Sequence, residues 1–80
     1  MGKAGKVLKI VLEAHDISQG KLADVLGIGR SNVYRWVHEI RDPNSETLIR
    51  IIDGLEKIDP EAAHRFRQLY LSSEASPNSP

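Results

Sequence analysis

Apolar residues recur at three- and four-residue spacing along most of this chain, a pattern typical of helices that share one core. The first such segment runs from Val7 to Ala14 without glycine or proline. A second, shorter segment begins at Ser18, a favourable N-cap, and ends at Gly27, which readily adopts the left-handed conformation that terminates helices. The sequence contains no internal repeat and no alternating segment long enough to indicate a strand. The pattern therefore predicts an all-α fold.

A third helix is predicted after the turn Gly27-Ile28-Gly29, and its two faces differ in character. Its apolar face consists of Val33, Trp36 and Val37, and its opposite face of Arg30, Ser31, Tyr34 and Arg35. Tryptophan at this spacing usually belongs to a core, so we expect Trp36 to be buried and Tyr34 to point the other way.

A fourth helix follows a loop predicted over residues 39–43, because the residue before Pro43 is disfavoured in the α conformation. Either Asn44 or Ser45 can cap this helix. Its apolar stripe consists of Leu48, Ile51, Ile52 and Leu55.

The pair Asp59-Pro60 provides an N-cap followed by proline at the first helical position, and so predicts a fifth helix. Its apolar residues are Phe66, Leu69 and Tyr70. They can close the core against the first helix or form a dimer surface, and the sequence does not distinguish the two. Residues 72–80 have almost nothing to bury, so we predict a five-helix domain over residues 1–71 and a disordered tail over 72–80.

Composition limits the function classes. Eighty residues, 40% of them hydrophobic, suffice for one small core. The chain has no cysteine and its three histidines are widely spaced, so we predict no disulfide, metal site or cofactor. No nucleophile with a base and an orienting partner is evident, which argues against an enzyme. Without a signal peptide or a bilayer-length apolar run, we expect a cytoplasmic protein with no membrane partner.

The net charge is zero, but the charges are unevenly distributed. Residues 1–41 contain seven basic and four acidic side chains, an excess of three positive charges, which the rest of the chain balances. This mild asymmetry permits one face to approach DNA while the acidic part faces away.

Two short helices joined by a glycine-containing turn form the geometry in which the second helix can lie in a DNA major groove. Arg30, Ser31 and Arg35 lie on the exposed face of that helix, and arginine is well suited to a bidentate contact with guanine. We therefore expect these residues to contact bases. Gln19 and Lys21 lie in the first turn of the preceding helix, where side chains and free backbone N–H groups can meet phosphates.

The segment SQGKLADVLGIGRSNVYRW followed by RDPNSETL resembles the helix-turn-helix family of the Cro and cI phage repressors, also called XRE-like. The similarity covers roughly residues 6–57 and rests on Gln19, Leu22-Ala23, Leu26-Gly27-Ile28, Val33, Arg35-Trp36, Arg41-Asp42-Pro43 and Glu46-Thr47-Leu48. The resemblance implies a five-helix, lambda-repressor-like domain. It also implies base contacts from the positions of Arg30, Ser31, Tyr34 and Arg35, and phosphate contacts from those of Gln19, Asn32 and Arg41.

This chain departs from the family pattern at three positions. Gly29 stands where serine or threonine is common, and it is a weaker helix cap. Val37 stands where many members have a glutamate paired with an arginine that aligns near Leu12; replacing both partners by apolar residues can preserve stability. Glu39 replaces the usual loop glycine, and its charge should repel phosphate.

These features predict a sequence-specific transcriptional regulator that binds double-stranded DNA, as a homodimeric repressor. A dimer is expected because one short helix reads few base pairs, and two-fold proteins bind half-sites roughly 34 Å apart. Two alternatives remain. One is the antitoxin of a toxin-antitoxin pair, with a toxin protein as partner. The other is a protein-interaction module that has lost DNA binding, which zero net charge and Glu39 would favour.

Overall fold

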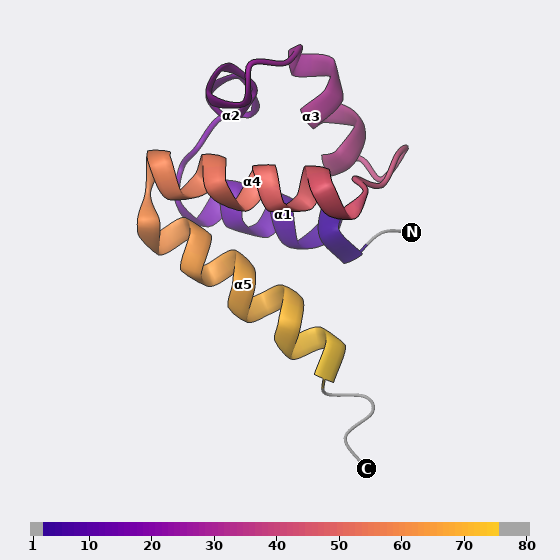
Figure 1. Cartoon of the computed structure of the whole chain (residues 1–80), viewed down its shortest axis with the longest axis vertical. Helices are drawn as coiled ribbons and strands as arrows, with labels where there is room; N and C mark the ends of the chain where they lie inside the picture. Colours follow the sequence, from indigo (N-terminus) through magenta and orange to yellow (C-terminus); the bar gives the residue numbers. More distant parts are fainter. Residues whose placement is uncertain (1–2, 76–80) are drawn as a thin grey trace.

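The computed structural model describes residues 3–75, with the side chains of residues 3–72. These residues form five α-helices and no strand, which confirms the predicted fold class. The helices are α1 (Lys3–Ala14), α2 (Gln19–Leu26), α3 (Arg30–Val37), α4 (Ser45–Ile58) and α5 (Pro60–Ala75). Figure 1 shows α2 and α3 together at one end of the molecule, α5 at the other, and α1 and α4 between them.

All five helices contribute to one core. Its largest fully buried side chains are Leu8 and Val11 from α1, Leu22 from α2, Val33 from α3, Ile51 and Leu55 from α4, and Phe66 from α5. Burying a side chain of this size contributes about 1.5–3 kcal/mol. The core therefore fixes the position of α3 from several sides.

Helix α5 is part of this core. Phe66, Ala62 and Ala63 have no exposed surface, and the helix packs on both α1 and α4. The small alanine side chains allow α5 to approach its neighbours closely. Of the two roles left open for the apolar face of α5, closing the core is the one the structure shows.

The starts of the helices have the predicted caps. The Ser18 hydroxyl accepts a hydrogen bond from the Lys21 backbone N–H at 3.0 Å, and α4 is capped by Asn44, whose Oδ1 accepts from the Thr47 N–H at 2.8 Å. Asp59 Oδ1 accepts from the Glu61 N–H at 3.1 Å. As expected, the Gly29 position gives α3 no side-chain cap.

The first three helices end in the same way. Each is followed within two residues by a residue with positive φ, and the residue after that donates its N–H to the carbonyl five positions earlier, as in a Schellman motif. The positive-φ residues are Asp16 (56°), Gly27 (71°) and Glu39 (59°), and the donors are Ile17, Ile28 and Ile40. The sequence indicated this conformation only for Gly27, because glycine pays no steric penalty there.

Two boundaries differ from the prediction. Helix α1 begins by Lys3 rather than Val7, and Ala4 and Gly5 are buried, because the start of α1 packs on α3. Helix α5 continues to Ala75, past residue 71 where the predicted domain ended. Residues 72–75 contain neither glycine nor proline, and extending an existing helix is far easier than nucleating one. The rest of the predicted tail, residues 76–80, lies outside the described residues.

Candidate nucleic-acid interface

The two faces of α3 separate as the sequence predicted. Val33, Trp36 and Val37 are buried, whereas Arg30, Ser31, Tyr34 and Arg35 are all exposed. The exposed set includes two guanidinium groups and a tyrosine ring with 48% of its surface accessible. The structure thus presents all four predicted base-contacting residues on the outer face of one helix.

The turn between α2 and α3 is held by backbone hydrogen bonds. The Gly27 N–H donates to the carbonyls of Ala23 and Asp24, and the Ile28 N–H donates to the Ala23 carbonyl at 3.1 Å. Side chains on both sides of the turn, Leu26 and Val33, are buried in the core. The angle between the two helices is therefore set by local hydrogen bonds and by shared packing.

Helix α4 supports this turn from behind, a role that the sequence did not reveal. Arg50 Nη2 donates to the Leu26 carbonyl at 2.7 Å, satisfying one of the carbonyls left free at the end of α2. Gly54 lies so close to α2 that a Cβ there would be 2.9 Å from Leu26 Cδ2. No local pattern identifies either contact, because each joins residues more than twenty positions apart.

Arg30 extends toward the start of α2. A Cβ built on Gly20 would be 3.1 Å from the Nη2 atom of Arg30 and 3.2 Å from its Nε atom. Arg30 and Lys21 also line one open concavity, together with the carboxylate-bearing Asp24 and the cap residue Ser18. Two of the predicted DNA-contacting cations, one from each helix of the motif, are thus brought together.

A second open concavity contains two other predicted residues. Asn32 and Arg41 line it, with Asn44 and Thr47 from the start of α4. Asn32 Nδ2 also donates to the Gly29 carbonyl at 3.3 Å, a bond that helps to hold the first turn of α3. The predicted phosphate contacts therefore form separate groups, one at the start of α2 and one between α3 and α4.

Tyr34 stacks on His38, an interaction that the sequence analysis did not identify. The ring centroids are 4.0 Å apart and the planes differ by 28°. The signal was present, since residues four apart lie on the same helix face. The stack continues the outer face of α3 beyond its last helical residue.

The departures from the family pattern have structural explanations. Leu12 and Val37, which replace the common charged pair, are 4% and 6% exposed and line the same concavity. Glu39 occupies the left-handed conformation, which explains why glycine is usual at this position. Its side chain lies over the start of α1, since Glu39 Cγ would be 3.3 Å from a Cβ on Gly5.

A family model described as a helix-turn-helix matches residues 8–61. The chain belongs to the helix-turn-helix family. The match extends over more than half of the sequence and includes every exposed α3 residue considered above, which confirms the XRE-type resemblance read from the motif.

Among curated proteins, the chain is similar to "Putative HTH-type transcriptional regulatory protein MJ1164" of Methanocaldococcus jannaschii. The two are 40% identical over 52 residues, which is 65% of this chain and 16% of the relative. The chain thus spans about a sixth of that protein's length. No solved structure matches the chain.

In the part of the chain from residue 3 to residue 75, no group of three or more histidine, cysteine, aspartate or glutamate side chains is arranged to hold a metal ion. None of the helices in this part of the chain is both long and apolar enough to cross a membrane.

Proposed function

We propose that this helix-turn-helix domain binds double-stranded DNA with sequence preference through α3, and that it acts as a dimeric transcriptional repressor. The observation that carries the proposal is the exposed row of Arg30, Ser31, Tyr34 and Arg35 on a helix whose other face is buried. Side chains that reach base edges must project from a rigidly held helix, and α3 is packed against α1 and α2.

The base-reading role falls chiefly on Arg35. It is exposed in the last turn of α3, and a guanidinium can donate two parallel hydrogen bonds to the O6 and N7 atoms of guanine. Ser31 lies one turn earlier on the same face and can pair with any base edge. Arg30, which reaches toward α2, can contact the neighbouring base or phosphate.

Phosphate contacts would come from either end of the motif. Gln19 and Lys21 lie in the first turn of α2, where backbone N–H groups are free to meet an anion. Asn32 and Arg41 line the concavity between α3 and α4. Contacts of this kind fix the position and orientation of the helix on the duplex but carry no sequence information.

The short recognition helix supports the proposal of a dimer. Helix α3 has eight residues and can reach only a few base pairs. Two copies bound to half-sites about one DNA turn, roughly 34 Å, apart would recognise a longer site. A regulator that covers its operator acts most simply by blocking transcription.

A DNA-binding assay with two matched variants tests the proposal. Duplexes selected from a random pool by the wild-type protein, and shuffled versions of them, would be titrated at one fixed salt concentration while anisotropy is followed. We expect a preference of about a thousandfold or more for the selected duplex. Analytical ultracentrifugation of the complex would establish whether two chains bind per site.

Two variants separate residues that recognise bases from residues that position the protein on the phosphates. Arg35→Ala should weaken binding to the selected duplex by about 1–3 kcal/mol and relax the preference, whereas Gln19→Ala should weaken binding to both duplexes equally. Arg65→Ala, an exposed arginine on α5, is the control and should change neither. Equal, weak binding of wild-type protein to both duplexes would overturn the proposal and favour the alternative of a protein-interaction module that has lost DNA binding. The antitoxin alternative is tested separately, by whether a toxin protein is encoded beside this chain.

A further inference from the structure

A third open concavity lies beside α3, on the side of α1. Its apolar floor includes Leu12 and Val37, the pair that replaces the charged residues of other family members. Around it lie Lys9 of α1, His38 at the end of α3 and Gln19 at the start of α2. Three separate elements therefore bring polar groups to one place, and one of these groups is already a predicted phosphate contact.

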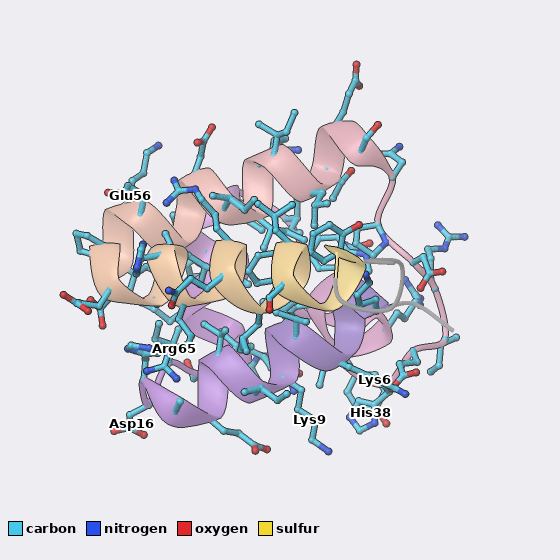
Figure 2. All side chains as sticks on the ribbon, turned by 90° about the horizontal axis from the view of Figure 1, so that it is seen from below. Lys6, Lys9, Asp16, His38, Glu56 and Arg65 are labelled. Carbon is cyan, nitrogen blue, oxygen red and sulfur yellow. The ribbon has the colours of Figure 1, made fainter. Side chains whose placement is uncertain are left out.

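Lysines of α1 extend this site along the helix. Lys6 and Lys9 are three residues apart, so they lie on the same helix face, and both are exposed. Figure 2 shows Lys6, Lys9 and His38 along the same edge of the molecule, and Lys9 lines the concavity together with His38. In the described part of the chain, neither lysine forms an ion pair with a carboxylate.

The position of this edge relative to α3 is fixed by close packing. Gly5 approaches the end of α3 so closely that an added Cβ would clash with the Trp36 carbonyl oxygen. His38 in turn stacks on Tyr34, one of the predicted base-contacting residues. The lysine-bearing face of α1 therefore continues directly from the outer face of α3.

Two of the nearby acidic residues lie at the other end of the concavity. Glu13 and Asp16 line the part formed by the end of α1, next to Ser18. Lys6 and Lys9 lie one to two turns earlier on α1, toward His38. Glu39 also lies near the start of α1, where its side chain covers Gly5. At the end of the edge that adjoins α3, the two lysines therefore outnumber the one nearby carboxylate, that of Glu39.

We propose that Lys6, Lys9 and His38 form a further phosphate-binding edge, which holds the DNA strand that borders the end of α3. Lysine acts at a phosphate as a compact charge and adds affinity without sequence preference. The His38 ring can donate one N–H to a phosphate oxygen while its face stays stacked on Tyr34. This inference rests on the proposed DNA-binding function.

Measuring how DNA affinity depends on salt concentration tests the proposed phosphate-binding edge. The logarithm of the binding constant falls with the logarithm of salt concentration, with a slope of about 0.9 per phosphate contacted by a cation. The double variant Lys6→Gln/Lys9→Gln should reduce the slope by about 1.8. Between 50 and 200 mM salt, the wild-type protein should therefore lose roughly twelvefold more affinity than the variant. The reduction should be the same for selected and shuffled duplexes.

Lys57→Gln is the matched control, since Lys57 is exposed on α4 and lines a different concavity with Asp53. It removes the same type of charge and should leave the slope unchanged. All of these side chains are exposed, so the thermal unfolding midpoints should stay close to that of the wild type, which a circular dichroism scan checks.

Each outcome bears on a different claim. If the double variant has the wild-type slope while wild-type protein binds its selected duplex tightly, the phosphate-binding edge is refuted and the proposed function stands. If Lys57→Gln lowers the salt slope by about 0.9, as each lysine of the double variant is expected to do, then the slope depends only on the overall charge of the protein. That result also refutes the phosphate-binding edge. If wild-type protein shows no salt-dependent binding to any duplex, the proposed function fails and the edge fails with it.

Discussion

Replacing Glu39 by glycine should make this protein more stable. Glu39 follows the C-cap residue of α3 with φ of 59°, and the adjoining Ile40 N–H donates to the Arg35 carbonyl at 2.8 Å. This left-handed conformation places the Cβ of any L-residue other than glycine close to a backbone carbonyl oxygen. Glu39→Gly removes that Cβ while leaving the helix-ending hydrogen bonds in place.

The magnitude is the difference of two terms. Relief of the left-handed strain is worth roughly 1–2 kcal/mol. Glycine also gives the unfolded chain more freedom, which costs about 0.4–1 kcal/mol. The net gain therefore lies between about 0 and 1.6 kcal/mol. Its midpoint, about 0.8 kcal/mol, corresponds to roughly 3–6 °C in the melting temperature of a domain of this size. The loss of the Glu39 Cγ atom beside Gly5 brings the gain toward the lower end.

Two control variants separate strain from charge, with urea denaturation followed by circular dichroism as the assay. Glu39→Ala removes the carboxylate but keeps the Cβ, so it should not show the gain. Gly27→Ala is the converse change, since Gly27 has φ of 71° and an added Cβ would meet no atom within 4 Å. It should destabilise the protein by roughly 0.5–1 kcal/mol through backbone strain alone.

The reasoning fails if Glu39→Gly is no more stable than the wild type, or if Glu39→Ala is stabilised equally. In the second case the carboxylate rather than the backbone would be responsible. DNA affinity provides a separate measure of the charge, because both Glu39 variants remove the same negative group. Both should bind duplex more tightly than the wild type, and by the same factor.

Two further substitutions test how the motif is held. Gly5→Ala should destabilise the protein by roughly 1–3 kcal/mol in urea denaturation, because its Cβ would overlap the Trp36 carbonyl and α1 would have to shift. Gly20→Ala is its control: the nearest neighbour there is a movable arginine guanidinium, and alanine favours the helix, so stability should not fall. Arg50→Ala should cost roughly 1–3 kcal/mol by leaving the Leu26 carbonyl without its donor. Unchanged stability in Arg50→Ala would show that water replaces the guanidinium there.

The sequence predicted most local features because their causes lie within a few residues. The caps at Ser18, Asn44 and Asp59 each join a side chain to a backbone N–H two or three residues later. The turn at Gly27 requires only a residue that tolerates positive φ. The spacing of apolar residues similarly predicted the buried and exposed faces of α3, because residues three or four apart lie on the same face of a helix.

Features that sequence reasoning missed have two physical origins. Asp16 and Glu39 adopt positive φ although neither is glycine, because the surrounding packing imposes the conformation on them. The sequence did not predict that α1 begins before Val7, because Gly5 is needed there for its small size. That size matters only because the Trp36 backbone packs against it in the folded protein.

The sequence by itself determined the five helices, most of their caps and the exposed face of α3, all of which depend on interactions within about one helical turn. The tertiary structure alone decided which helices meet. It placed Arg50 at the end of α2, Asp59 3.2 Å from His15, and the lysines of α1 beside His38. Arg50 is 24 residues from Leu26 and Asp59 is 44 residues from His15, so no pattern of neighbouring residues in the sequence predicts either contact. Only the packing of the core, which sets how the helices cross, brings these groups together.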